Sequence, residues 1–391
     1  MKRNMKILTF TEKISGLSAA SLHSQYYEEF VYLSKFLDTL IICSSKIENS
    51  NKIPEKVLFK QISTINIKFL YGISKMINYA LAAYSLRKQI DLIYVRSVSP
   101  PEIFTLWFSK FFVRKPLVLT IGGTCIYEPL TFKNRIFRWI FSNTLDSVDK
   151  IVVYSSKMIP YIKQINPKLK DEKFEIIHNA INHNRFIPTQ KNEDLLKKLE
   201  IPNDYKVIMF VGRLNEKKGV LEIINVANNL KNEKVKFILI GEFEENSVDH
   251  KKIMHAIDVL ELDESVFFTG AIPNSQMADY LSCADIYIYM PKRCEGIPRS
   301  ILEAMGCGKP VIATGIAGIP EAVISAQTGF LVDNYIDAAK MIKNMLSDQK
   351  LYDTISKNCR EKIVKEFSYD IIVPKMIDLF TTTITDSHRQ E

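Results

Sequence analysis

The stretch ADIYIYMPKRCEGIPRSILEAMGCGKPVIAT, residues 284–314, contains one complete strand–loop–helix–strand unit. Its apolar run IYIYM predicts a strand, and a loop with two prolines and one glycine follows it. A helix is predicted at about 299–306, with Gly308 as its C-terminal stop and KPVIAT as the next strand. Two glutamates, Glu295 in the loop and Glu303 in the helix, lie on either side of the helix start. What these two acids bind is the most informative question that the sequence raises.

A short apolar run followed by a helical pattern recurs along the whole chain. The runs are MKILTF, DTLIICS, DLIYVRS, PLVLTIGG, KIVVYSS and FEIIHNA in the first half, and KVIMFVG, VKFILIG, SVFFTG, ADIYIYM, KPVIAT and TGFLV in the second. Runs without polar alternation are typical of strands buried on both faces, as in a parallel sheet covered by helices. Six such units in each half predict an α/β protein with two doubly wound, Rossmann-like domains.

The junction between the halves is predicted in the polar, proline-bearing segment 178–196. We therefore expect an N-terminal domain at 1–185, a C-terminal domain at 186–365, and a final helix at 366–391 that crosses back toward the first domain. Ligands of open parallel sheets bind at the carboxyl ends of the strands, so we expect the site in the cleft between the two domains.

The net charge of +8 is unevenly distributed along the chain. Residues 1–190 contain 27 Lys/Arg and 14 Asp/Glu, whereas residues 191–391 contain 25 and 30. A basic half of this kind predicts an anionic partner, which would be a membrane surface, a phosphorylated lipid or a nucleic acid. No apolar run approaches the ~18 residues that a membrane span needs, so we expect a cytoplasmic protein.

Two cations follow the first strand of the second half, in the segment VIMFVGRLNEKKGV. Arg213 comes directly after the strand, and Lys218 comes just before a helix. A helix N-terminus favours anions, and an arginine and a lysine together suit a diphosphate, which Arg binds bidentately and Lys as a point charge. Ordinary solvated charges at a strand–helix turn would give the same pattern.

The two glutamates lie around the start of the predicted helix at 299–306. Gly296 would let the backbone approach a ligand closely, and the free N–H groups of the helix start lie between the acids. A ligand with phosphates in its middle and polyols at its ends fits this arrangement, with Glu295 and Glu303 accepting hydrogen bonds from sugar hydroxyls or a ribose diol. Solvent-exposed glutamates on an ordinary helix remain the alternative.

Several other classes of site have no support in the sequence. No GxGxxG follows the first strand, GCGKP is not a P-loop, and Asp-x-Asp, GxSxG and HExxH motifs are absent. The six cysteines are scattered without the spacing of metal ligands. We therefore expect no bound cofactor and no metal.

The segments FVGRL…KKG, GAIPNSQMADYLSCADIYIYMP and EGIPRSILEAMGCGKPVIATGIAGIPEAV resemble the retaining GT-B glycosyltransferases of family 4. Glu295 and Glu303 match that family's E-x7-E signature. The resemblance implies two Rossmann-like domains facing across a cleft. It also implies an enzyme that moves a sugar from a nucleotide diphosphate sugar to an acceptor without a metal and with the anomeric configuration retained. The donor would be a UDP-, GDP- or ADP-sugar.

The resemblance also implies roles for individual residues. Arg213 and Lys218 would neutralise the diphosphate, Glu295 would contact the donor sugar near its reacting carbon, and Glu303 would hold the ribose. The further substrate-binding positions that it implies are Gly16, Ile272, Gly296, Ile297, Arg299 and Ser300. The backbone at 270–272 would border the base, and the amides after Gly296 would cradle the phosphates.

One position departs from the family pattern. Many relatives carry a histidine in the loop after the fourth strand, whereas this chain reads LTIGGTCIYEP there. Thr124 or Glu128 would be the side chains available near the donor sugar.

The basic half contains two segments that mix aromatic and basic residues, WFSKFFVRK at 107–115 and FKNRIFRWIF at 132–141. Such a face suits an anionic bilayer, where the protein would be peripheral on the inner face of the cell membrane. The acceptor would then be a saccharide or a lipid-linked saccharide in polysaccharide or lipopolysaccharide assembly. Two other functions stay open, a sugar-phosphate enzyme of the same fold (a phosphorylase or an epimerase) and a basic nucleic-acid-binding protein. The second lacks a recognition motif, so we expect no nucleic-acid partner.

Overall fold

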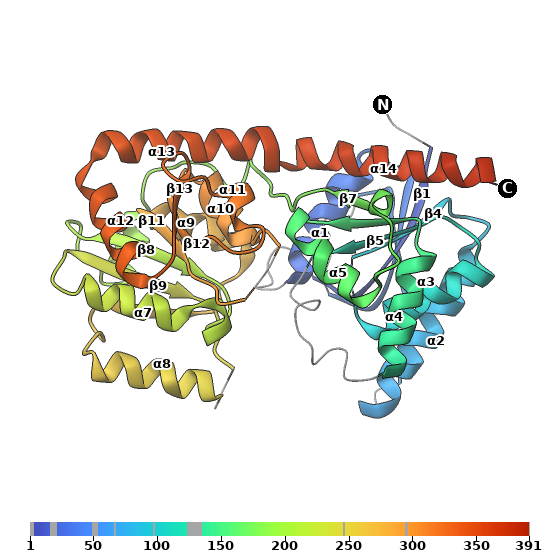
Figure 1. Cartoon of the computed structure of the whole chain (residues 1–391), viewed down its shortest axis with the longest axis horizontal. Coiled ribbons are helices and arrows are strands. Elements are labelled where there is room, and N and C mark those ends of the chain that lie inside the picture. The colour runs from blue at the N-terminus through green and yellow to red at the C-terminus, as the bar shows by residue number, and fades with distance from the viewer. Residues whose placement is uncertain are drawn as a thin grey trace. The chain divides into compact units, whose positions relative to one another are not determined.

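The computed structural model describes residues 4–15, 22–48, 54–65, 68–96, 98–122, 135–244, 247–293 and 296–390. The chain forms two compact units, drawn in Figure 1. The first contains Met1–His178 together with Ile372–Glu391, and the second contains Asn179–Ile371.

The first unit is built on a parallel sheet of seven strands in the order β3-β2-β1-β4-β5-β6-β7. The strands are β1 (Lys6–Ser15), β2 (Thr39–Glu48), β3 (Val57–Gln61), β4 (Leu92–Val95), β5 (Leu117–Ile121), β6 (Lys150–Val153) and β7 (Phe174–Ile176). The α-helices between them are α1 (Leu22–Ser34), α2 (Lys68–Leu86), α3 (Pro100–Phe112), α4 (Arg135–Ser147) and α5 (Ile159–Ile165).

The second unit is built on a parallel sheet of six strands in the order β10-β9-β8-β11-β12-β13. Its strands are β8 (Lys206–Val211), β9 (Val235–Ile240), β10 (Val266–Gly270), β11 (Ile286–Tyr289), β12 (Val311–Thr314) and β13 (Gly329–Val332). Its α-helices are α6 (Glu193–Lys198), α7 (Val220–Asn229), α8 (Val248–Val259), α9 (Met277–Cys283), α10 (Arg299–Gly306), α11 (Ile319–Ala322), α12 (Tyr335–Ser347) and α13 (Gln349–Lys362), and α14 (Tyr369–Gln390) ends the chain.

The predicted α/β class and all twelve predicted strands are confirmed. The strand that the apolar pattern missed is β3, at the edge of the first sheet. Val57 is buried, whereas Leu58, Lys60 and Gln61 are exposed. An edge strand covered on one face does not need an unbroken apolar run, so this pattern could not reveal it. The predicted helix at 299–306 is also confirmed, and Gly308 adopts the left-handed conformation (φ 71°) of a C-terminal stop.

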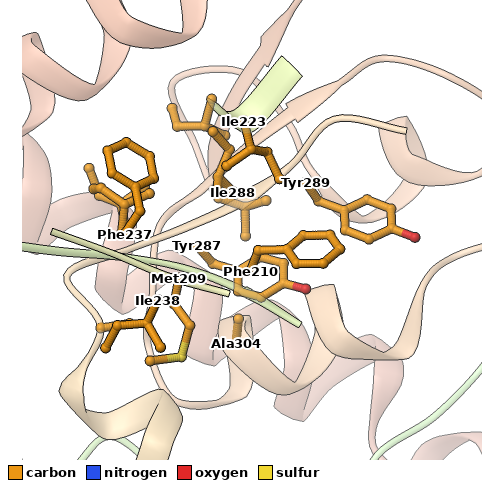
Figure 2. Close-up of a cluster of buried hydrophobic side chains, with 14 of the residues drawn as sticks. Met209, Phe210, Ile223, Phe237, Ile238, Tyr287, Ile288, Tyr289 and Ala304 are labelled. Carbon is orange, nitrogen blue, oxygen red and sulfur yellow. The ribbon is translucent and has the colours of Figure 1, made fainter. Parts of the chain in front are cut away.

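The core of the second unit is a continuous apolar cluster around β8, β9 and β11 (Figure 2). Phe210 and Phe237 are among its largest fully buried side chains, and Ile288 and Ala304 are also fully buried. Side chains in the middle of these strands are enclosed in the core and cannot reach a ligand. Ligand-binding side chains are therefore expected at the strand ends, along the carboxyl edge of the sheet. None of the described helices combines the length and the apolar character that a membrane span requires.

The direction of strand succession reverses between β8 and β11 in the second sheet and between β1 and β4 in the first. In open sheets of this type a crevice forms at such a switch point, outside the carboxyl ends of the strands. The loops that leave β8 and β11 therefore occupy the ligand-binding position of the second unit.

Candidate functional site

The turn after β8 carries the two predicted cations, Arg213 and Lys218. Arg213 is exposed, and Lys218 is half-buried at the end of a short 3₁₀ helix, Glu216–Lys218. The Asn215 side chain caps this helix by accepting a hydrogen bond from the Lys218 backbone N–H (3.0 Å). Asn215 is a functional neighbour that the sequence analysis missed, although an asparagine before a helical turn is a recognised capping signal.

Gly219 joins this turn to α7 in a conformation that only glycine adopts readily. Its φ is 79°, and a Cβ built on it would lie 1.6 Å from the carbonyl oxygen of Met290. The backbone of Lys292 also donates to the carbonyl of Lys217 (3.0 Å). The loops after β8 and β11 are therefore in direct backbone contact, and Lys218 is held at their junction.

Glu216 of this turn pairs with a lysine of α8 and with a lysine of the loop after β11. Glu216 lies 3.1 Å from the ammonium of Lys252 and 3.6 Å from that of Lys292. The hydrogen bond from Lys252, with its positive charge, lowers the pKa of Glu216. Lys292 also contacts Glu222 (3.1 Å), whose hydrogen bond raises the pKa of Lys292. These pairs connect the turn to α8, and the loop after β11 to both the turn and α7.

The loop after β11 leads into α10. Gly296 and Ile297 are buried directly before Pro298, and the helix begins at Arg299. Ser300 is half-buried in its first turn. The first N–H groups of such a helix have no intrahelical partner and suit an anion. Glu295 and Gly16, two predicted contacts of the donor, lie outside the described residues, as do Thr124 and Glu128.

Glu303 is buried and ion-paired, which excludes the open interpretation that it is a solvated helix residue. Its carboxylate accepts from Nε of Arg299 at 2.8 Å, one helical turn earlier. The Arg299 guanidinium also donates through Nη1 to the hydroxyl of Tyr369 (2.9 Å), at the start of α14. Tyr369 is a second neighbour that sequence patterns did not reveal, because it lies 70 residues away.

The loop after β10 reaches the same edge of the sheet. The N–H of Gly241, after β9, donates to the carbonyl of Gly270 (3.0 Å), and the N–H of Leu214 donates to the carbonyl of Glu242 (2.9 Å). Ile272, expected to border the base, is buried just beyond Gly270. The fold thus gathers the turns after β8, β9 and β10 at one edge, and the loop after β11 joins them there.

The chain is similar to known glycosyltransferases. Residues 191–362, which contain the turns described above, match the family model of the glycosyl transferases group 1. The chain is 26% identical over 315 residues to CapM of Staphylococcus aureus, a capsular polysaccharide biosynthesis glycosyltransferase (78% of this chain and 74% of that protein). It is also 26% identical over 314 residues to the N,N'-diacetylbacillosaminyl-diphospho-undecaprenol alpha-1,3-N-acetylgalactosaminyltransferase of Campylobacter jejuni (76% and 79%).

The solved structures agree at the level of the fold. HepE of Anabaena, crystallised with UDP-glucose, superposes with a TM-score of 0.78 and 19% identity over 97% of this chain and 100% of that one. This likeness shows the fold of the chain. The chain has the GT-B fold, and its residues 191–362 are similar to the group 1 glycosyltransferases.

Proposed function

We propose that the chain is a retaining, metal-independent enzyme of glycosyltransferase family 4 that uses a UDP-, GDP- or ADP-sugar. The observation that carries this proposal is the placement of Arg213 and Lys218 in the turn after β8, at the switch point of the second sheet. Their turn contacts the loop that leads to the N-terminus of α10. Two cations and a helix start at one sheet edge suit a diphosphate.

The chemistry follows from where charge develops. When the bond between the anomeric carbon and the diphosphate breaks, negative charge accumulates on the departing phosphate. Arg213 and Lys218 would stabilise that charge from fixed positions, which lowers the barrier more than it tightens binding of the ground state. With this charge met by side chains, no metal ion is required. The acceptor hydroxyl would attack on the face that the diphosphate leaves and pass its proton to the departing phosphate oxygen, so that the configuration is retained.

For the acceptor, we propose a saccharide or a lipid-linked saccharide in polysaccharide or glycoconjugate assembly. The name of CapM refers to capsular polysaccharide, and that of the Campylobacter jejuni relative refers to a saccharide on diphospho-undecaprenol. Such a lipid keeps its chain in the bilayer and exposes an anionic pyrophosphate. An enzyme that acts on it would work at the cytoplasmic face of the membrane.

The surface of the first unit supports a peripheral membrane location. On α4, Ile136 and Trp139 are 70% and 59% exposed, beside the exposed Arg135 and Arg138. Phe132 and Lys133, part of the same predicted face, lie outside the described residues. Helix α3 contacts both α4 and α2, as Figure 1 also shows. Helix α2 also carries exposed apolar side chains, which are Leu70, Ile73, Ile77, Leu81 and Tyr84.

The proposed activity is tested by incubating the purified chain with UDP-, GDP- and ADP-glucose in EDTA and measuring release of the nucleoside diphosphate. We expect release from one donor, and a product whose anomeric proton shows the donor's configuration by NMR. The matching diphosphate should also raise the melting temperature by a few degrees, since a ligand at ~100 times its Kd adds ~2.7 kcal/mol. A requirement for a divalent ion would contradict metal independence, and release only with orthophosphate would indicate a phosphorylase.

A further inference from the structure

The ammonium of Lys218 makes a contact that the sequence did not predict. Its Nζ donates to the hydroxyl of Tyr289 at 3.1 Å and lies 5.8 Å from the centre of that ring. The two residues are 71 positions apart and come from neighbouring parts of the sheet edge, the turn after β8 and the last residue of β11. Tyr289 therefore contacts one of the two cations that we propose act on the diphosphate.

Packing in the core fixes the orientation of the Tyr289 side chain and therefore the position of its hydroxyl. The side chain is 2% exposed, and its ring stacks on Phe210 of β8 with centroids 5.7 Å apart and planes 12° from parallel. Figure 2 shows the ring beside Phe210 with its oxygen directed away from the apolar cluster. A ring clamped in this way has little freedom at either side-chain torsion, so the position of its oxygen is determined by the core.

Both ends of the Lys218 side chain are thus restrained. Its backbone is capped by Asn215 and followed by Gly219, and its ammonium is bonded to a rigid hydroxyl. An unrestrained lysine has a flexible four-carbon stem and loses that freedom when it binds an anion. An ammonium has three donors, and Tyr289 accepts one of them.

We propose that Tyr289 is a positioning residue that fixes the ammonium of Lys218 toward the departing diphosphate. This inference rests on the proposed function and adds a residue to its machinery. A fixed ammonium stabilises the negative charge that develops on the diphosphate during transfer. Removing the Tyr289 hydroxyl therefore lowers kcat more than it changes KM for the donor.

The chain offers a matched control in Tyr287, two residues earlier on the same strand. Tyr287 is fully buried, and its hydroxyl bonds to the backbone of Val211, donating to the carbonyl at 3.2 Å. Tyr287→Phe and Tyr289→Phe each delete one buried hydroxyl from β11 and keep the ring in the core. The two variants differ in whether the deleted hydroxyl bonds to Lys218.

The experiment is a double-mutant cycle in the transfer assay, with melting temperatures measured for every variant. We expect Tyr289→Phe to lower kcat roughly tenfold with KM for the donor within about twofold, and Tyr287→Phe to leave kcat within about twofold. In a Lys218→Ala background, Tyr289→Phe should have no further effect on kcat, since the group that it positions is gone.

Three results would overturn the inference: an unchanged kcat in Tyr289→Phe, an equal loss in Tyr287→Phe, or independent, multiplicative losses in the cycle. A fall in melting temperature that alone accounts for the loss of kcat would count against it as well. Measurements on the wild-type chain and on Lys218→Ala separate this inference from the proposed function. If the wild-type chain releases no diphosphate, or if Lys218→Ala retains full activity, the proposed function fails rather than the role of Tyr289.

Discussion

Arg299 and Glu303 form an ion pair with 2.8 Å between Nε and Oε1, and their side chains are 6% and 7% exposed. Both residues were predicted to contact the donor. The structure adds that they are bonded to each other and, through Arg299, to Tyr369. The pair fixes the first turn of α10, whose free N–H groups are the proposed phosphate cradle. The role of Glu303 toward ribose stays a prediction.

Removing one member of this pair should destabilise the second unit strongly. Arg299→Met leaves the Glu303 carboxylate buried without its cation, for which a loss of about 3–5 kcal/mol in the free energy of unfolding is expected. Urea denaturation measures the change. Glu361→Gln provides a control, because it breaks the exposed pair with Lys365 and should not change stability measurably. Equal stability of Arg299→Met and the wild type would show that the pair is unimportant to the fold.

This pairing also determines how Glu303 should be tested. Glu303→Ala would delete the whole carboxylate, including the acceptor oxygen that Arg299 bonds, so a loss of donor binding would be confounded with a loss of stability. Glu303→Gln keeps the shape and an acceptor oxygen. At temperatures where this variant remains folded, we expect calorimetry to find at least tenfold weaker binding of the matching nucleoside diphosphate, because a charge-assisted bond to the ribose becomes a neutral one. Unchanged affinity would place Glu303 in the fold alone.

The two cations of the turn after β8 should matter for turnover. Arg213→Ala and Lys218→Ala are each expected to lower kcat by about 10²–10³, the usual cost of removing a group that stabilises developing charge. Steady-state kinetics with the preferred donor measures the effect. Lys217→Ala, in the same 3₁₀ helix and exposed, should stay within about twofold of the wild type. If all three variants lose activity equally, net charge rather than placement would be responsible.

Gly219 should not tolerate a side chain. Gly219→Ala places a methyl group against the carbonyl of Met290 in a left-handed conformation, so the turn that carries Lys218 must move. We expect kcat/KM to fall by about 10², since small displacements of catalytic groups have effects of this size. Gly72→Ala in α2 is the control, because its methyl group meets no atom within 4 Å and should leave kcat/KM unchanged. Normal activity of Gly219→Ala would mean that the turn adapts freely.

Membrane association through α4 can be tested by charge substitution. Trp139→Asp should reduce binding of the chain to vesicles that contain anionic phosphatidylglycerol, because it removes an apolar contact and adds repulsion. Co-flotation at low and high salt measures binding. Ile336→Asp on α12 of the second unit, at a residue 58% exposed, provides the matched control and should bind as the wild type does. Absence of wild-type binding to these vesicles would refute the peripheral location.

The buried cysteines should be unreactive in the folded protein. Burial raises the pKa of Cys43 and of Cys307 from 9.0 to about 12. At pH 8 roughly one thiol in ten thousand would be a thiolate at either position, and the thiolate is the reactive species. Peptide mapping after brief alkylation should find both unmodified, and both modified after denaturation. Rapid native labelling at either residue would show that the unit opens locally.

Much of the fold was predictable because its signals are local. The apolar runs before Gly212 and Gly241 mark strands buried on both faces. Such a run is visible in the sequence without knowledge of which strand lies beside it. The helix at 299–306 was predictable for the same reason, from its proline-bearing start and its glycine stop. Edge strand β3 was not, because one-sided cover leaves no such run.

The candidate site was predictable in part. Arg213, Lys218 and Glu303 were selected by their positions at strand ends and a helix start, which are properties of sequence order. The partners of these residues, Tyr289 for Lys218 and Arg299 with Tyr369 for Glu303, were not predicted. Two of these contacts join residues at least 70 positions apart.

The sequence by itself determined the succession of strands and helices and the class of the fold. It also determined which residues at the strand ends resemble the glycosyltransferase motifs. Only the tertiary structure decided that β11 lies beside β8, so that Tyr289 reaches Lys218, and that α14 begins beside α10, so that Tyr369 reaches Arg299. The physical reason is that apolar periodicity is read within a few residues of chain, whereas a hydrogen bond between distant side chains depends on strand order and on the packing that brings the two backbones together.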